Sequence, residues 1–190
     1  MTSTLSNEMF FAILALDAYN RGYDAKLTDL SDSLGTRLGD AKIIDSAGDK
    51  SAQDIGFYAI AYDWNGKTVI SFRGTDNPNT LQKGNDIWNG WVGGADILST
   101  QSEAALKFYQ SVTGQSPFKK ADDIVLTGHS LGGGLAGYTA ALTNGAAYIY
   151  DPMPFAAASI TKMIDENIKQ KLGSVDFMSF LLGQKIHPIH

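Results

Sequence analysis

A serine flanked by two glycines is the feature of this sequence best suited to chemistry. In Gly128-His129-Ser130-Leu131-Gly132, the glycines let neighbouring backbone approach a serine held in a sharp turn between a strand and a helix. In such a turn the hydroxyl stands clear of the backbone, where a base can remove its proton and N–H groups can bind an oxyanion. The pattern predicts acyl transfer with Ser130 as the nucleophile.

The bare Gly-x-Ser-x-Gly pattern can arise by chance in a chain with 20 glycines, so the segments on either side of it must support the interpretation. Ile124 to Leu126 is a short apolar run typical of a buried strand, and Leu131 to Leu142 favours a helix rich in glycine and alanine. Strand, turn and helix therefore follow one another in the order that a nucleophilic serine requires.

Two segments resemble class 3 (fungal-type) lipases. Val125 to Gly133, with the letters VLTGHSLGG, is similar to the nucleophile elbow of that family. Phe72 to Thr75, with the letters FRGT, is similar to a family segment found at a comparable distance upstream, and here Phe72 precedes Gly128 by 56 positions (72 to 128). The resemblance runs from about Phe57 to Asp176, and it implies an α/β-hydrolase fold and the cleavage of carboxylic esters.

The resemblance also implies the oxyanion donors. It assigns that role to Thr75, beside the backbone N–H of Leu131, and Gly74 would permit the tight turn that points the next amide toward Ser130. The family places its lid after this segment, where Leu81 to Val92 carries two tryptophans. Two interpretations stay open for those tryptophans: a small apolar lid over the site, or burial in the core.

Three histidines could act as the base: His129, His187 and His190. Strand geometry turns the side chain of His129 away from the neighbouring Ser130, so we expect His129 to be structural. His187 is the expected base and His190 is the alternative.

Two aspartates could orient the histidine. Asp176 resembles the family's acid and gives the chain order Ser, Asp, His, whereas Asp151 directly follows the next strand, at the position that lipases of the pancreatic group use. We favour Asp176 and keep Asp151 as the alternative. Only 11 positions separate Asp176 from His187 (176 to 187), so either the fold is C-terminally minimal or the histidine lies beyond residue 190.

The remaining elements are predicted from periodicity and turn signals. Ser6 is a candidate N-cap for a helix that reaches about Arg21, and Asn65-Gly66 is a strong hairpin signal. The other predictions are a loop over Leu27 to Gly48, strands over Ile55 to Trp64, Lys67 to Phe72 and Ala146 to Tyr150, helices over Ser102 to Val112 and Ala156 to Leu172, and an apolar segment over Val175 to Leu182. Strands that alternate with helices predict an α/β fold, with a mostly parallel central sheet covered by helices on both faces.

The composition predicts one domain over residues 1–190 that takes a small-molecule ester or lipid as its partner. With 190 residues, 44% of them hydrophobic, the chain suits a single core. Scattered basic residues and a net charge of −5 argue against nucleic acid, and no cysteine is present. The apolar run Met9 to Leu16 lacks the basic flank of a signal peptide and is too short to span a bilayer.

We therefore expect a carboxylic ester hydrolase that works through an acyl-enzyme on Ser130, without a metal or organic cofactor. A phospholipase A1, a thioesterase, an acyltransferase and a non-catalytic lipid-binding domain with an incomplete triad are the alternatives. A soluble chain without an N-terminal signal peptide is expected, which leaves the cytoplasm and signal-independent export both open. The sequence does not indicate the acyl-chain length or the oligomeric state.

Overall fold

The computed structural model of the chain describes residues 5–23, 36–74, 96–116, 123–153 and 162. The chain divides into two units, Met1–Phe155 and Ala156–His190, and apart from Lys162 all that follows concerns the first. The expected lid over Leu81 to Val92 lies outside the described residues, as do the expected segments Ala156 to Leu172, Lys162 apart, and Val175 to Leu182. One domain over residues 1–190 stays a prediction.

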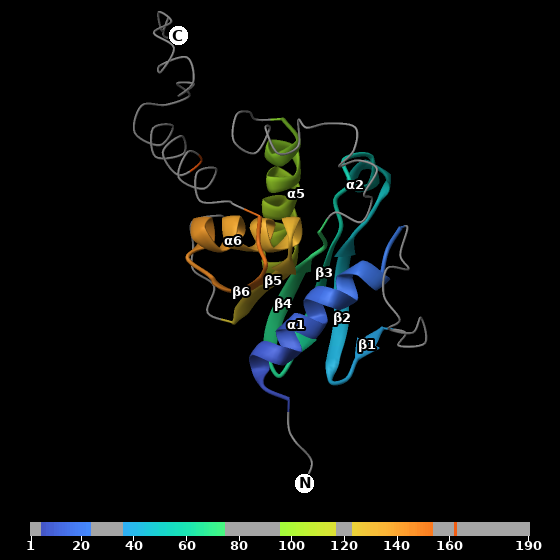
Figure 1. Cartoon of the computed structure of the whole chain (residues 1–190), viewed down its shortest axis with the longest axis vertical. Helices are drawn as coiled ribbons and strands as arrows, with labels where there is room; N and C mark the ends of the chain where they lie inside the picture. The colour runs from blue at the N-terminus through green and yellow to red at the C-terminus, as the bar shows by residue number, and fades with distance from the viewer. Residues whose placement is uncertain (1–4, 24–35, 75–95, 117–122, 154–161, 163–190) are drawn as a thin grey trace, which may run out of the picture. The chain divides into compact units, whose positions relative to one another are not determined.

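A mixed sheet forms the centre of the described structure, with six strands that lie side by side in chain order (Figure 1). Each of the first three strands pairs antiparallel with the next, and the fourth, fifth and sixth pair in parallel. The second, fourth, fifth and sixth strands consequently point the same way, so among the described strands the sheet is mostly parallel, as predicted. The strands are β1 (Arg37–Leu38), β2 (Ala41–Ala47), β3 (Ala59–Trp64), β4 (Lys67–Phe72), β5 (Ile124–His129) and β6 (Ala146–Tyr150).

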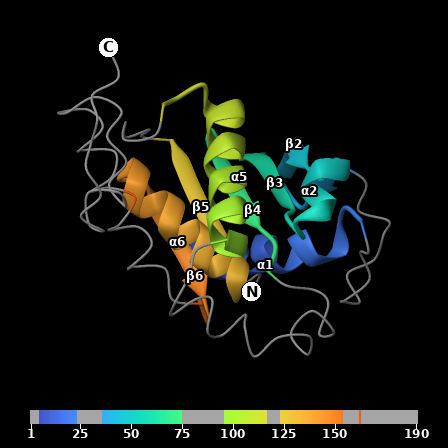
Figure 2. The ribbon, with the colours of Figure 1, turned by 90° about the horizontal axis from the view of Figure 1, so that it is seen from above.

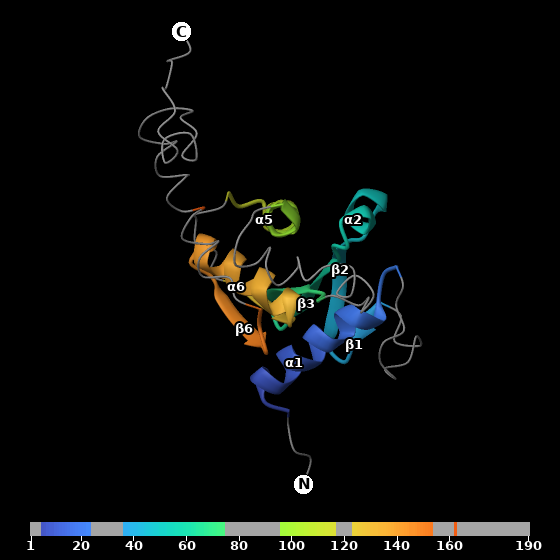
Figure 3. The same ribbon diagram turned by 45° about the horizontal axis from the view of Figure 1, so that its top comes forward.

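Helices cover both faces of the sheet (Figures 2 and 3). One face packs against α1 (Asn7–Asp17), which the short 3₁₀ helix η1 (Ala18–Asn20) continues, and the other packs against α5 (Asp96–Thr113) and α6 (Leu131–Thr143). Alternate strand residues enter the two cores, because successive side chains on a strand point to opposite faces. Val69 and Val125 meet α1, whereas Ile70 and Leu126 meet the other two helices. This arrangement is the α/β fold that the sequence predicts.

Two of the predicted local signals are confirmed. The Ser6 side chain caps α1 by accepting a hydrogen bond from the Met9 N–H at 3.3 Å. Asn65 and Gly66 join β3 to β4 with φ of 50° and 74°, the two positive values that a type I′ turn requires. Asn144, with φ of 52°, ends α6 in the left-handed region.

The predicted loop over Leu27 to Gly48 is wrong in its second half, where β1 and β2 lie, while residues 24–35 lie outside the described residues. Most of β2 is exposed, including Ile44 at 49%, so its sequence lacks the alternation of a half-buried strand. Backbone pairing with β3 builds this strand, and a register shift between Ile43 and Asp45 further blurs the pattern.

Several predicted boundaries also shift. The strand expected from Ile55 begins only at Ala59, because residues 50–54 form the helix α2 (Lys50–Asp54), which Asp49 caps by accepting from the Ala52 N–H at 2.9 Å. The helix expected from Ser102 begins at Asp96, and the strand expected to end at Leu126 continues to His129. In the described part of the chain, every helix is too short or too polar to cross a membrane.

Candidate active site

The carboxyl ends of β4, β5 and β6 meet at one edge of the sheet, which brings together three segments that are distant in sequence. In the parallel register Phe72 lies opposite Gly128, and His129 lies opposite Tyr150. The 56 positions between Phe72 and Gly128 are thus the register offset of β4 and β5. Ligands of open α/β sheets bind at such an edge, so this is the place to look for the site.

Ser130 occupies a strained turn between β5 and α6. Its φ of 56° and ψ of −124° are rare for a residue that carries a Cβ, and they typically cost about 1–3 kcal/mol. Such strain persists only where the surroundings enforce it, and it occurs most often at functional sites. The expected strand, turn and helix around Ser130 are all present.

The segment after β6 holds this strained turn in place through the Ser130 backbone. The Ser130 N–H donates to the Tyr150 carbonyl at 3.1 Å, and the Ser130 carbonyl accepts from the Met153 N–H at 3.0 Å. The same carbonyl accepts the first helical hydrogen bond of α6, from the Gly134 N–H at 3.0 Å. Asp151, which is exposed and has φ of 42°, lies between the two partners from this segment.

The two glycines of the motif permit close packing. A Cβ on Gly128 would overlap the Gly132 carbonyl, so Gly128 lets the first turn of α6 approach β5. A Cβ on Gly132 would overlap the Phe72 carbonyl, so Gly132 lets the same turn approach the end of β4. The two glycines therefore bring the first turn of α6, which directly follows Ser130, close to the strand end that precedes Thr75.

Leu131 is the first residue of α6, and its side chain is buried. The first N–H groups of a helix have no partner within the helix, so the Leu131 N–H lies at the end of α6 where helices commonly bind anions. The position of Leu131 at the start of α6 fits its predicted role as an oxyanion donor.

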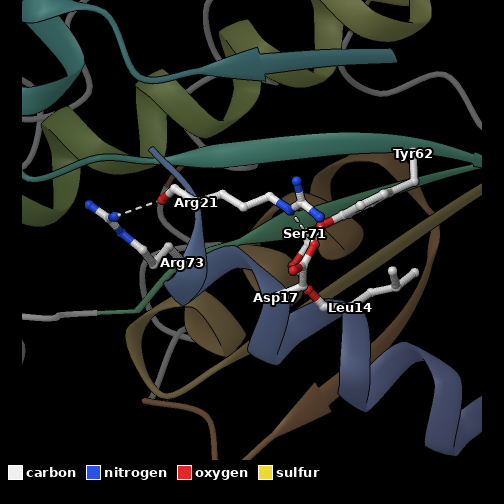
Figure 4. Close-up of polar contacts among 6 residues, drawn as sticks. All are labelled: Leu14, Asp17, Arg21, Tyr62, Ser71 and Arg73. Atoms are coloured by element: carbon white, nitrogen blue, oxygen red, sulfur yellow. Dashed lines mark hydrogen bonds and ion pairs between the residues drawn. The ribbon is translucent and has the colours of Figure 1, made fainter. Parts of the chain in front are cut away.

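Arg73 follows β4 and is buried, at 2% exposure. Its Nη1 donates to the carbonyls of Tyr23 at 2.8 Å and Arg21 at 3.2 Å, and Figure 4 draws the second of these bonds. Its guanidinium carbon lies 4.3 Å from the ring centre of Tyr23 and 5.0 Å from that of Tyr58. Arg73 thus binds the segment after η1 to the strand end that precedes Gly74.

A partly buried ion pair joins the last residue of α1 to the residue that follows η1. Arg21 Nε approaches Asp17 Oδ2 at 2.5 Å, and the Tyr62 hydroxyl donates to the same oxygen at 2.7 Å (Figure 4). Nearby, the Ser71 hydroxyl donates to the Leu14 carbonyl at 3.0 Å. A buried carboxylate requires such partners, and together they attach α1 to the middle of β3 and β4.

His129 contacts Tyr19 of η1. The Tyr19 hydroxyl lies 3.1 Å from His129 Nδ1 and 3.3 Å from the His129 carbonyl oxygen. The two ring centres are 6.0 Å apart in an edge-on arrangement. A structural role for His129, as the sequence predicts, fits these contacts.

A family model describes most of this chain. The model of the phospholipase-like family, a Tle-like phospholipase domain, matches residues 10–175, which include the elbow and all six strands. The chain belongs to this Tle-like phospholipase family. Membership supports the hydrolysis of lipid esters in general, and it makes a lipid a fitting substrate.

Other comparisons add little to this family assignment. A solved structure, the nonglycosylated LIP2 lipase of Yarrowia lipolytica, is similar with a TM-score of 0.41 and 18% sequence identity, over 80% of this chain and 60% of that one. No curated protein matches the sequence. The α/β-hydrolase fold of this Tle-like phospholipase domain rests on its own strand order and its strained elbow.

Four of the predicted site residues lie outside the described part of the phospholipase-like chain: Thr75, Asp176, His187 and His190. Ser130, Leu131 and Asp151 are described, and the structure brings these three to the same edge of the sheet. Within the described ranges, no group of three or more His, Cys, Asp or Glu side chains is placed to hold a metal ion.

Sequence reasoning missed the contacts that hold the elbow and the end of β4 from outside their motifs. Tyr19 and Tyr23 come from the N-terminal part of the chain, and Tyr19 meets His129 across 110 positions. Met153 binds Ser130 through its backbone alone. No local pattern marks such residues, since their roles depend on the register of the sheet.

Proposed function

We propose that this chain is a serine hydrolase that cleaves carboxylic esters of lipids through an acyl-enzyme on Ser130. The observation that carries the proposal is the strained Ser130 backbone, held at the carboxyl edge of a parallel sheet and at the first turn of α6. Membership of a phospholipase-like family supports a lipid ester as the substrate.

In the proposed route, Ser130 Oγ attacks the ester carbonyl carbon while His187, or alternatively His190, accepts its proton. The Leu131 N–H and Thr75 stabilise the oxyanion of the tetrahedral intermediate. The histidine then donates the proton to the departing alcohol, and water hydrolyses the acyl-enzyme by the reverse sequence of proton transfers. No step of this route uses a metal or an organic cofactor.

Asp176 is our proposed orienting acid, with Asp151 as the alternative. Asp151 lies directly after β6, next to the backbone partners of Ser130. Asp176→Asn should lower kcat by about 10⁴-fold while Asp151→Asn leaves most activity, because an amide disturbs the tautomer of the histidine. The reverse ranking of the two variants would transfer the role to Asp151.

The test of the proposed function is hydrolysis of p-nitrophenyl esters of increasing acyl length by the wild type and by Ser130→Ala, with His187→Ala and His190→Ala beside them. The proposal predicts turnover that is lost with Ser130 and with one of the two histidines. Turnover that survives in Ser130→Ala would refute the mechanism. Lipid binding without any turnover would favour the non-catalytic lipid-binding alternative.

A phospholipase A1 is the second candidate, since the family description names phospholipase activity. Product analysis on a phosphatidylcholine with different acyl chains at its two positions separates the classes. Release of the sn-1 acid favours this candidate, transfer to an added alcohol favours an acyltransferase, and preference for an acyl thioester favours a thioesterase.

A further inference from the structure

Tyr19 is a buried aromatic residue that the proposed mechanism does not use. It belongs to η1, directly after α1, and only 8% of it is exposed. Its hydroxyl lies within hydrogen-bond distance of two atoms of His129, the residue before the nucleophile. A phenol buried beside the elbow is well placed to affect the geometry of Ser130.

Whether both contacts of the Tyr19 hydroxyl are hydrogen bonds depends on the tautomer of His129. The hydroxyl has one proton, which it donates to the His129 carbonyl oxygen at 3.3 Å. The contact at 3.1 Å from Nδ1 is then a second hydrogen bond only where Nδ1 carries a proton and donates it to the phenol oxygen. The geometry therefore favours the Nδ1–H tautomer, in which both bonds form at once.

The same hydroxyl also contacts the end of β4. A Cβ on Gly74 would overlap the Tyr19 oxygen and would lie 2.7 Å from the His129 carbonyl oxygen. The Tyr19 hydroxyl, Gly74 and the His129 carbonyl oxygen therefore lie close together, where the two strand ends that precede Thr75 and Ser130 meet. Only a residue without a side chain at position 74 permits this contact.

We propose that Tyr19 is a positioning residue for the elbow: its hydroxyl fixes His129 against the end of β4 and thereby sets the distance between Ser130 and Gly74. This inference rests on the proposed function, because it assigns a catalytic consequence to the contact. Loss of the Tyr19 hydroxyl should lower kcat more than it changes substrate affinity, since Tyr19 acts through the backbone of the neighbouring residues.

Tyr19→Phe tests the proposal, with Tyr62→Phe as the matched control. Each variant loses one buried phenol hydroxyl, but Tyr62 pairs with Val69 in the middle of the sheet, away from the edge where Phe72 ends. We expect Tyr19→Phe to lower kcat roughly tenfold with little change in KM, since misplaced reacting groups are costly. Tyr62→Phe should keep wild-type kcat while lowering Tm by at least as much as Tyr19→Phe does.

A spectroscopic measurement follows the tautomer directly. In protein labelled with ¹⁵N-histidine, the His129 signals, assigned by their loss in His129→Gln, should indicate Nδ1–H in the wild type and shift toward Nε2–H in Tyr19→Phe. Tyr62→Phe should leave them unchanged. The tautomer signal reports the hydrogen bonds between Tyr19 and His129, and kcat reports their effect on Ser130.

The outcomes separate this inference from the proposed function. Wild-type kcat in Tyr19→Phe, beside an inactive Ser130→Ala, overturns the positioning role alone. An Nε2–H tautomer in the wild type overturns it as well. Ester turnover that is absent from the wild type, or that survives in Ser130→Ala, overturns the proposed function and this inference with it.

Discussion

Ser130 has a backbone conformation that a side chain makes costly, and the residues around it compensate for that cost. Three hydrogen bonds, from or to Tyr150, Met153 and Gly134, fix its N–H and carbonyl groups. Strain at this residue is consistent with a nucleophile whose hydroxyl must stand clear of the turn.

A comparison of two variants at position 130 tests this strain. Ser130→Ala and Ser130→Gly both remove the hydroxyl, but only glycine relieves a φ of 56° with ψ of −124°. We expect Ser130→Gly to be more stable than Ser130→Ala by about 1 kcal/mol in urea denaturation, and both to be inactive. Equal stability of the two would mean that the backbone is not strained.

Arg73 contributes to stability through geometry as well as charge. Arg73→Lys keeps the charge but loses the planar group that lies between Tyr23 and Tyr58, and we expect it to lower the free energy of unfolding by about 2 kcal/mol. Arg37→Lys on exposed β1 is the control and should change it by less than about 0.5 kcal/mol. Equal effects in urea denaturation would contradict the role of the two carbonyl bonds to Arg73.

At the residue scale, local patterns predict what local chemistry determines. The glycines and the strand and helix runs around Ser130 indicate its turn, and Ser6 and Asn65 predict a cap and a hairpin that the structure contains. The partner of His129 could not be predicted, because Tyr19 lies 110 positions away and reaches it only through the packing of η1.

At the scale of elements, the close approach of α6 to β4 and β5 positions the candidate site. The approach depends on glycines that face backbone carbonyls, where no side chain could move aside. The glycine-rich start of α6, costly for an isolated helix, is thereby explained.

Neighbouring glycines of α6 provide a matched test of this approach. A Cβ on Gly132 would overlap the Phe72 carbonyl, whereas a Cβ on Gly133 would lie 3.1 Å from the Gly128 carbonyl oxygen and 3.2 Å from Pro152. Gly132→Ala should therefore destabilise the protein by at least about 2 kcal/mol more than Gly133→Ala in thermal or urea unfolding. Both variants gain the same helix propensity, so equal stabilities would refute the close approach.

The elements that sequence reasoning missed are those built by pairing rather than by pattern. β2 is largely exposed and polar, so only its register with β3 identifies it as a strand. The helix α2 is five residues long, too short for a periodic signal. Strands β4 and β6 have the predicted bounds, and β5 begins at the predicted residue but runs three residues further, to His129.

At the scale of the whole molecule, the sheet buries several tyrosines whose phenols are kept neutral. Burial, more than the nearby Asp17 carboxylate, raises the pKa of Tyr62 well above its ordinary value of 10.0. Burial also raises the pKa of Tyr58, although Arg21 and Arg73 oppose the shift. The folded protein therefore retains phenol protons that the unfolded chain releases.

This difference predicts how stability depends on alkaline pH. Stability from the neutral phenols is fully present below about pH 10 and is lost as pH rises above that value, because only the unfolded chain then ionises. The Tm of the wild type should fall above about pH 10, and the Tm of Tyr62→Phe should fall less steeply. Identical slopes for the two proteins in thermal unfolding from about pH 9 to about pH 11 would contradict the buried state of Tyr62.

Covalent labelling of Ser130 tests most directly whether this serine is the nucleophile. Wild type and Ser130→Ala would each be treated with a lipid-like fluorophosphonate, digested and mapped by mass spectrometry. We expect a single adduct on the peptide that contains Ser130, and none in the variant. An adduct on another residue, or equal labelling of both proteins, would contradict the central claim that this elbow carries the nucleophile.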